Sequence, residues 1–576
     1  MHRNKKLRLF ILPGILCMLA MLVAACGSNG TSDTSASSTS QKASVDKQVF
    51  NLAFPGIEDI KTFDPAMATS QTSLDAINMS FTGLVQLDNN LQVQPQMASS
   101  WKQSADGLTW TFALKPGLKF SDGTPITSKD IAYSIDRALQ PALNSPASPS
   151  YLNLIKDSDK LLTGKIKTII GDSLMTPDDN TIVIVANTNA SYFLATLTYQ
   201  TSYVVEKSLV DKYGDIKWTD HLTEGGTAGP FKVQEYTHGQ RIVFVPDPNY
   251  YGPKPQLQKV TYTFVKDAET AYKNYQVGSI DAVGVPFSHL EEAKALTKEY
   301  HQVPILTTAY YGMNMLAKPF DNIKIRQAFA LAINKDAINK AVYKGVYIPT
   351  NHIVPQGMPG YNPDLKGPDG MTSTSGNPTM AKQLLQEGMQ EAGYANVAAL
   401  PTISFKYPSG SADTDNEVAA VIQQWQSVLD VNVKAVPEDF EKLSAEQPQT
   451  VGNDKLQFFY AAWGDDYPDP QDFLTLQFSK DSPNNQTNYG QNQTAAAATQ
   501  VQMQNLMTQA DTMTDSTARM KAYNQAEQHL VNDVAWLPTF QWARARLLQS
   551  YVVGRVYNAQ DFIPADAWSK MYIAAH

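Results

Sequence analysis

The sequence predicts a mixed α/β protein with at least two lobes, and two observations carry this prediction. The chain has 576 residues, which is more than one hydrophobic core normally supports, so at least two lobes are expected. Segments with the two-residue alternation of strands interleave along the chain with segments of helical periodicity. This interleaving favours α/β or mixed lobes over an all-α or all-β body.

Strand patterns occur along most of the chain, several of them next to turn signals such as Asp106-Gly107 and Asp122-Gly123. The predicted strands are residues 49–54, 110–114, 181–186, 260–265, 403–405, 431–433 and 456–460. They provide the β half of the predicted α/β body.

Helical segments are marked mainly by their ends. Thr127 and Asp130 form a capping-box pattern before an apolar row that runs to residue 139. Pro378 and Gly393 delimit a second helix in the order typical of helix starts and stops. Three further helices are predicted from periodicity at residues 325–342, 417–429 and 517–531, the last capped by Asp515.

The first 25 residues have the pattern of a secretory signal peptide. Four basic residues within residues 1–8 precede an apolar run from Leu9 to Ala25, which is shorter than the ~20 residues that span a bilayer. Leu22-Val23-Ala24-Ala25-Cys26 resembles a bacterial lipobox, which implies that Cys26 is lipidated; an ordinary cleavage site with an incidental cysteine is the alternative. Residues 26–48 are rich in Ser, Thr and Gly and predict a lipid anchor followed by a flexible tether.

Composition excludes several classes of site. The two cysteines are Cys17 and Cys26, so we expect no disulfide and no Cys-ligated metal in the body of the protein. Removing residues 1–25 takes four of the 46 Lys and Arg residues and none of the 55 Asp and Glu residues, which leaves a net charge of −13. An acidic body argues against nucleic acid as a ligand.

Enzyme signatures are absent from the sequence. It contains no His-Glu-x-x-His, no Gly-x-Ser-x-Gly, no Walker loop and no Gly-x-Gly-x-x-Gly. We therefore expect no catalytic residues, no metal and no cofactor. A secreted hydrolase assembled from distant residues is the alternative from another functional class.

Residues 461–470 contain the densest cluster of unusual residue types, with Trp463, several aspartates and two prolines after a predicted buried strand. The end of such a strand could place the Trp463 ring and the aspartate carboxylates at a cleft. On this pattern alone a Pro-rich turn whose aspartates cap a helix near Gln471 is the competing interpretation. Asp469 is then the better cap, and Asp466 the better candidate for ligand binding.

Several segments, in order along nearly the whole chain after the linker, resemble one family. They are Phe63–Pro65, Phe81–Leu84, Pro95–Ala98 with Trp101, Trp110–Pro125 with Ser128–Asp130, Gly229–Phe231, Pro319–Arg326 with Ala328, Trp463–Pro470, and Met571–Ile573 with His576. They are similar to the oligopeptide-binding proteins of ATP-driven peptide importers, in extracellular solute-binding protein family 5, which also includes dipeptide and nickel binders. Residues 145–151, 161–165 and 542–547 resemble the oligopeptide binders within that family.

The resemblance implies a bilobed periplasmic-binding-protein-like fold with an extra inserted domain and a ligand cleft between the lobes. The implied parts are a first lobe (49–85, 223–310 and 539–576), an inserted subdomain (86–222) and a second lobe (311–538). The hinge crossings fall near residues 308–314 and 537–541.

The resemblance also implies the site residues. Asp466 occupies the position of the aspartate that binds the peptide ammonium, and a closed cleft would make that pair charge-assisted. Thr69-Ser70-Gln71 and Ala462-Trp463-Gly464 would pair with the peptide backbone by strand addition. Trp463 would wall a side-chain pocket, with a core tryptophan as the alternative.

Three tyrosines complete the set of candidates. Tyr310 and Tyr311 lie near the predicted hinge and could face the cleft or the core. Tyr460 stands where oligopeptide binders can have an arginine, so the partner of the peptide carboxylate is left open. Arg326 is a candidate substitute, although its amphipathic helix favours a structural ion pair.

The function implied is that of a lipid-anchored, extracytoplasmic substrate-binding protein. We expect it to be a monomer that captures short peptides and delivers them to the permease subunits of an ABC importer. The alternative on the same scaffold is a non-peptide ligand, either an oligosaccharide or a metal chelate.

Overall fold

The computed structural model describes residues 41–480 and 482–576. The predicted signal peptide (1–25), Cys26 and most of the linker predicted for residues 26–48 lie outside this range. The folded body begins at Lys42, seven residues earlier than predicted. Lys42 forms an isolated β-bridge with Ala574, and the Ala43 N–H donates to the carbonyl of Ile573 at 2.9 Å. None of the described helices is long and apolar enough to span a membrane.

A four-stranded sheet forms the centre of the first lobe, in the order β1–β10–β9–β8. Its strands are β1 (Val49–Pro55), β8 (Phe231–Thr237), β9 (Arg241–Pro246) and β10 (Lys259–Val265). Phe50, Phe231 and Phe244 are fully buried in one core beneath the sheet, and α1 (Gln71–Ser80) adds Leu74 and Ile77 to it. The predicted strands at 49–54 and 260–265 are confirmed.

The inserted segment has a sheet and a hydrophobic core of its own, with strand order β4–β5–β7–β6. Its elements are β4 (Ala98–Gln103), β5 (Thr109–Leu114), β6 (Leu174–Asp178), β7 (Thr181–Val185), α2 (Ser128–Ala138), α3 (Ser148–Tyr151), α4 (Ser158–Leu162) and α5 (Phe193–Thr196). The predicted capping box of Thr127 and Asp130 is confirmed. From Tyr203 onward several buried side chains, such as Trp218, pack on the first-lobe core, whereas Val204 and Ala228 pack on the inserted core.

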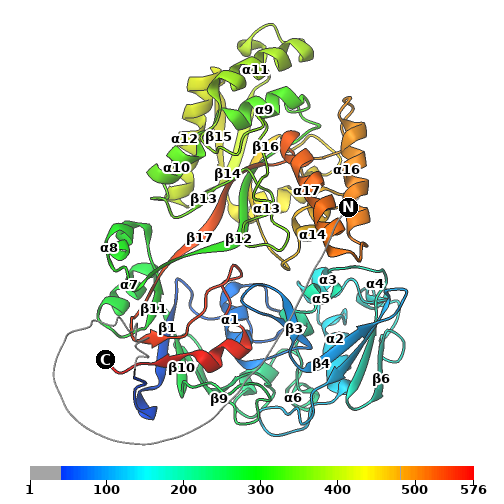
Figure 1. Cartoon of the computed structure of the whole chain (residues 1–576), viewed down its shortest axis with the longest axis vertical. Helices are drawn as coiled ribbons and strands as arrows, with labels where there is room; N and C mark the ends of the chain where they lie inside the picture. The colour runs from blue at the N-terminus through cyan, green and yellow to red at the C-terminus, as the bar shows by residue number, and fades with distance from the viewer. Residues whose placement is uncertain (1–40, 481) are drawn as a thin grey trace, which may run out of the picture. The chain divides into compact units, whose positions relative to one another are not determined.

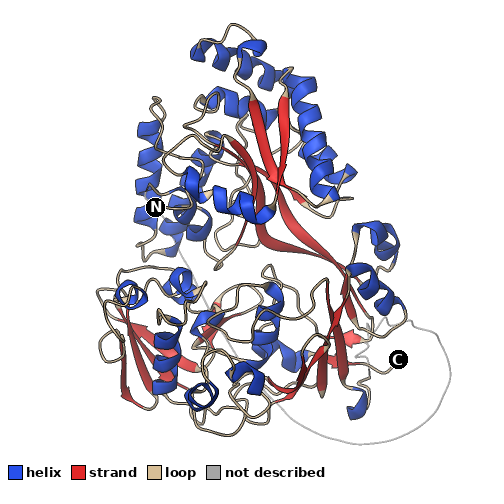
Figure 2. Ribbon diagram, turned by 180° about the vertical axis from the view of Figure 1, so that it is seen from behind, coloured by secondary structure: helices blue, strands red, loops and turns tan. Residues whose placement is uncertain are grey.

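The second lobe is built on a mixed sheet with the strand order β11–β17–β12–β16–β14–β15. These strands are β11 (Ala282–Gly284), β12 (Tyr300–Met313), β14 (Ile403–Pro408), β15 (Val433–Glu438), β16 (Phe458–Gly464) and β17 (Leu537–Leu548), with β13 (Ile348–Pro349) beside β17. The helices are α9 (Ile323–Leu331), α10 (Lys335–Ala341), α11 (Pro378–Ala392), α12 (Ala412–Leu429), α13 (Phe440–Glu446), α14 (Pro470–Phe473), α15 (Thr475–Phe478), α16 (Ala497–Ala510) and α17 (Ser516–Asn532). Figure 2 shows helices flanking this sheet.

Most of the second-lobe helices follow the sequence signals. Asn377 caps α11, which ends at Gly393 in the left-handed conformation, and Asp515 caps α17. The single helix predicted for residues 325–342 is wrong, because the chain forms two helices there. Asn334 accepts from the Ala337 N–H and starts α10 as a new helix.

Two long antiparallel strands, β12 and β17, connect the lobes (Figure 1). At one end Tyr300 pairs with Leu547, next to β11 and the first-lobe core. At the other end Met313 pairs with Phe458 of β16 inside the second lobe. Their pairing shifts register between Pro304 and Thr308 and again between Ala309 and Tyr310, next to the segments predicted as hinge crossings.

The remaining elements are short or lie at the edges of the first lobe. They are β2 (Val85–Leu87) with β3 (Val93–Pro95), β18 (Val552–Val553) with β19 (Tyr572–Ile573), and the helices α6 (Lys207–Tyr213), α7 (Ala268–Gln276) and α8 (Leu290–Ala295). The β18–β19 pair holds the C-terminal segment against the first-lobe core, where Val552 and Ile573 are buried.

Candidate functional site

Asp466 lies in the short connection between β16 and α14. The strand predicted at 456–460 continues to Gly464, and α14 begins at Pro470. Asp469 caps that helix, since its Oδ1 accepts from the Gln471 N–H at 2.9 Å. The capping role that the sequence allowed therefore falls to Asp469, and Asp466 is left available for other contacts.

The Asp466 carboxylate contacts the inserted subdomain. Its Oδ1 accepts a hydrogen bond of 2.8 Å from the Tyr151 hydroxyl. The Tyr151 ring stacks on Tyr199 with ring centroids 3.4 Å apart, and the Tyr199 hydroxyl donates to the carbonyl of Ala68 at 3.3 Å. Through these contacts, Tyr151 and Tyr199 connect Asp466 to the first-lobe segment that precedes Thr69.

Two further carboxyl groups lie beside Asp466. Asp472 Oδ2 accepts from the Trp463 Nε1 at 3.2 Å and from the Asp466 N–H at 3.0 Å, and its Oδ1 is buried without a hydrogen-bond partner among the described residues. Asp465 accepts from Gln560 Nε2 at 2.9 Å. In the described part of the chain no Lys, Arg or His forms an ion pair with any of the three.

Burial raises the pKa of all three carboxyl groups. It raises the pKa of Asp465 to about 7, and it raises the pKa of Asp466 while the Tyr151 hydrogen bond opposes the shift. The pKa of Asp472 is raised well above its usual range by burial and by the charge of Asp466. A cluster of one buried acid, Asp472, and two half-buried acids, Asp465 and Asp466, without a described protein cation favours a positive group from outside.

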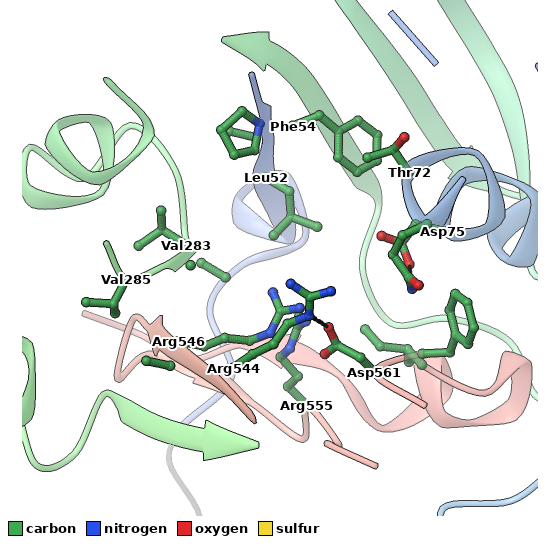
Figure 3. A pocket seen from close by; sticks show the side chains of 18 of the residues that line it. Leu52, Phe54, Thr72, Asp75, Val283, Val285, Arg544, Arg546, Arg555 and Asp561 are labelled. Carbon is green, nitrogen blue, oxygen red and sulfur yellow. Dashed lines mark hydrogen bonds and ion pairs between the residues drawn. The ribbon is translucent and has the colours of Figure 1, made fainter. Parts of the chain in front are cut away.

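Asp466 lines a narrow cavity of about 60 Å³, together with Tyr199, Gln200 and Gln560. A larger cavity of about 470 Å³ adjoins it, since Asn78, Phe562 and Ile563 line both. The larger cavity is lined from β1, α1, β11 and β17 (Figure 3). The two cavities therefore share part of their walls, and Asp466 lines the smaller one.

The end of β16 has one open edge. β14 pairs with β16 only at Phe458 and Phe459, so residues 462–464 have no described strand on that side. The Asp465 N–H donates to Leu306 of β12 at 2.9 Å. In an antiparallel pair, successive residues direct their backbone N–H and C=O groups alternately toward the partner strand and away from it. Since Asp465 bonds to β12, Trp463 also directs its backbone groups to β12. Ala462 and Gly464 direct theirs to the open edge. That edge can accept an extended chain.

Comparison with known proteins identifies the family. Residues 92–485 match the family model described as "Bacterial extracellular solute-binding proteins, family 5 Middle". The chain belongs to this family.

Two curated relatives of this family 5 protein match along almost their entire length. The oligopeptide-binding protein OppA of Bacillus subtilis is 26% identical over 94% of this chain and 97% of its own. The periplasmic oligopeptide-binding protein OppA of Escherichia coli is 28% identical over 90% and 91%. A solved structure of the periplasmic murein tripeptide-binding protein MppA, in its unliganded open form, superposes with a TM-score of 0.78 at 24% identity, covering 94% of this chain and 99% of its own. The bilobed α/β fold predicted from the sequence is confirmed.

The first-lobe backbone segment of this family 5 protein is shorter than predicted. Thr69 is exposed and Ser70 has an extended backbone, with φ −92° and ψ 139°. Gln71 is instead the first residue of α1, where its Nε2 donates to Asp75 at 3.3 Å, and its side chain lines the larger cavity. Ser70 thus has an extended backbone, whereas Gln71 already belongs to the helix.

None of the four aromatic candidates lines either of the two cavities among the described residues. Trp463 is half-buried against the second-lobe core and held by Asp472. Tyr310 is buried and stacks on Trp536 with centroids 3.6 Å apart. Tyr311 and Tyr460 are buried in the core around Trp425. These three tyrosines line neither cavity in the described part of the protein, because β12 and β16 turn their rings into the lobe.

Arg326 has a structural role, but it is not the ion pair that the sequence suggested. It is 1% exposed, and its guanidinium donates to the carbonyl oxygens of Phe320 and Asp533. Sequence reasoning also missed Tyr151, Tyr199 and Asp472. The segment 145–151 carried a signal through its resemblance to oligopeptide binders, whereas nothing local marks Tyr199 or Asp472.

Proposed function

We propose that this protein captures short peptides in the space between its lobes and delivers them to the permease of an ABC importer. Asp466 is the observation that carries the proposal. A half-buried carboxylate, without a described cationic partner and at the wall of a cavity, is suited to the α-ammonium group that peptides share.

The backbone of the peptide would be held in a way that does not depend on its sequence. Ala462 and Gly464 turn backbone groups toward an open strand edge. Exposed Thr69 and extended Ser70 would provide the backbone groups of the first lobe. Strand addition of this kind recognises main-chain groups and leaves the side chains free. Ser70 Oγ, which is buried without a described partner, adds a polar atom to that segment.

Mass spectrometry of what co-purifies tests the ligand class. The protein lacking residues 1–26 is expressed in the cytosol and its bound material is extracted. We expect intact peptides of similar length and varied sequence. A single oligosaccharide, metal chelate or cyclic cofactor would contradict the proposal, and one curated relative of this family is named a heme-binding protein.

We further propose that Cys26 is lipidated and anchors the protein on the outer side of the membrane, which the lipobox pattern at residues 22–26 supports. Metabolic labelling with a fatty acid should mark the full-length protein and leave the Cys26→Ser variant unlabelled. The variant should also leave the membrane fraction. Equal labelling of both proteins would exclude Cys26 as the anchor.

A further inference from the structure

Three arginines meet in the larger cavity, away from Asp466. Arg544 and Arg546 alternate along β17, so their side chains point to the same face of the strand. Arg555 follows β18 in the C-terminal segment. Figure 3 shows their guanidinium groups gathered at one place, with Asp561 beside them and Asp75 reaching in from α1.

The charges of this group do not balance. Asp561 pairs with Arg544 at 3.2 Å and with Arg546 in close contact. Arg555 forms no ion pair within the described residues, and Asp75 is the only other carboxylate that lines the cavity. With both carboxylates ionised the three arginines still leave one positive charge. Burial raises the pKa of Asp75 to about 7, which increases that excess at and below neutral pH.

Several guanidinium N–H groups of the arginine cluster have no hydrogen-bond acceptor among the described residues. Nε of Arg546, and Nε and Nη1 of Arg555, are buried without a hydrogen-bond partner among the described residues. Two buried arginines elsewhere use their donors, since the guanidinium of Arg137 bonds to Asp64 and Asp215 and that of Arg326 bonds to backbone carbonyls. Buried Arg519 also leaves its Nε without a described partner, but both of its Nη atoms bond to Asp469. Unpaired buried donors are costly, so such a cluster favours an external acceptor.

We infer that the cavity at Arg544, Arg546 and Arg555 is a carboxylate-binding subsite for the ligand. The inference rests on the proposed function, because it assigns the second charged end of the same ligand. An Arg guanidinium binds a carboxylate through two parallel N–H donors. This cavity and the cavity at Asp466 share Asn78, Phe562 and Ile563 in their walls, so we assign the ammonium of a bound peptide to Asp466 and a carboxylate of the same peptide to the arginines.

Apolar walls make the subsite selective for charge. Leu52, Phe54, Val283 and Val285 line the same cavity, and low-polarity walls strengthen the interaction of the arginines with an anion. The carboxylate could come from the peptide C-terminus or from an acidic side chain. Both share the chemistry that the arginines recognise, and the experiment distinguishes them.

The test compares matched peptides by titration calorimetry with the full mature protein. In the first series, peptides of several lengths are each compared with a free and with an amidated C-terminus. In the second series, one internal position at a time carries either Glu or Gln. We expect one of these changes to weaken binding to the wild-type protein at least tenfold. Sensitivity to amidation at one length points to the C-terminus, and sensitivity to Glu at one position points to a side chain.

Variants show whether the arginines cause that discrimination. In Arg555→Gln and Arg544→Gln the wild-type preference for the carboxylate should shrink to threefold or less, and Arg555→Lys should keep part of it. Arg241→Gln is the control, because Arg241 of β9 is exposed outside the cavity, where it pairs with Glu235 of β8. It should retain the full preference. Thermal unfolding checks that each variant is folded.

A peptide-independent measurement separates this inference from the proposed function. Succinate, compared with sodium chloride at equal ionic strength, should raise the unfolding temperature of wild type and Arg241→Gln saturably but not that of Arg555→Gln. If peptides bind and acid and amide forms bind equally at every length and position, the inference is overturned. If no peptide binds, the proposed function fails, and equal succinate shifts in all variants would then overturn the inference as well.

Discussion

The Tyr151 hydroxyl group, in the inserted subdomain, donates a 2.8 Å hydrogen bond to Asp466 of the second lobe, 315 positions along the chain. The bond supports the ionised form of a carboxyl group whose pKa burial raises. It also joins the inserted subdomain to the second lobe, beside a small apolar cluster that Tyr151 and Tyr467 share.

Replacing Tyr151 by Phe should weaken peptide binding roughly three- to tenfold, the net worth of about one ordinary hydrogen bond. Loss of the hydroxyl raises the pKa of Asp466 further, so the fall in affinity on acidification should begin at a higher pH. Titration calorimetry between pH 4 and 8 measures both effects. Tyr192→Phe is the control, since Tyr192 stacks on Tyr467 at the same interface with centroids 5.5 Å apart. Identical pH profiles for wild type and Tyr151→Phe would contradict this account.

The buried pair Arg137–Asp64 should contribute strongly to stability. Asp64 accepts from Nη1 and Nη2 of Arg137 at 3.1 and 2.6 Å and from Trp218 Nε1 at 3.2 Å. Asp64→Asn leaves a buried guanidinium without its main counter-charge, so the free energy of unfolding should fall by about 3 kcal/mol. Chemical denaturation measures it.

A surface pair provides the control for that variant. Asp179 pairs with Lys129 at 3.0 Å, with both side chains more than 60% exposed, so Asp179→Asn should cost less than about 1 kcal/mol. Equal losses for the two variants would show that the Arg137–Asp64 pair has no special role.

Glu417 should make the protein less stable as the pH rises. It is fully buried, and accepts from the hydroxyl groups of Tyr311 at 2.6 Å and Tyr343 at 2.5 Å. Burial raises its pKa to about 7, from the ordinary glutamate value of 4.5. The folded state therefore binds more protons than the unfolded state between these values. The free energy of unfolding falls across that window, by about 3 kcal/mol for this group.

The variant Glu417→Gln should remove that share of the pH dependence. Its free energy of unfolding, relative to wild type, should improve by about 3 kcal/mol between pH 4.5 and pH 8. Denaturant titrations at several pH values measure the difference, and Glu58→Gln, at an exposed position, serves as the control. A constant difference between Glu417→Gln and wild type across the range would contradict the assignment.

The elements best predicted from the sequence are those with local end signals. The capping box at Thr127, the Asp515 cap and the Gly393 stop specify helix ends through neighbouring atoms, so the sequence contains all the information needed. Periodicity alone missed the break at Asn334, because the apolar spacing continues across it while the side chain starts a new helix.

Only part of the site could be predicted. Asp466 lies in a recognisable motif. Its distance from the helix start distinguishes it from Asp469, which is placed to cap that helix. The arginine cluster depends on β1, α1, β11 and β17 meeting around one cavity. Its one local signal, the Arg544-Ala545-Arg546 alternation on a strand, becomes informative only when the opposite wall is known.

The central claim is that Asp466 receives the α-ammonium group of a peptide, and a double comparison by titration calorimetry tests it most directly. Wild type, Asp466→Asn and the exposed control Asp454→Asn are titrated with one peptide in free and N-acetylated form. The account predicts that acetylation weakens binding to wild type and to Asp454→Asn at least tenfold, or about 1.4 kcal/mol, and leaves binding to Asp466→Asn almost unchanged. Equal affinities of wild type for the free and acetylated peptides would contradict it.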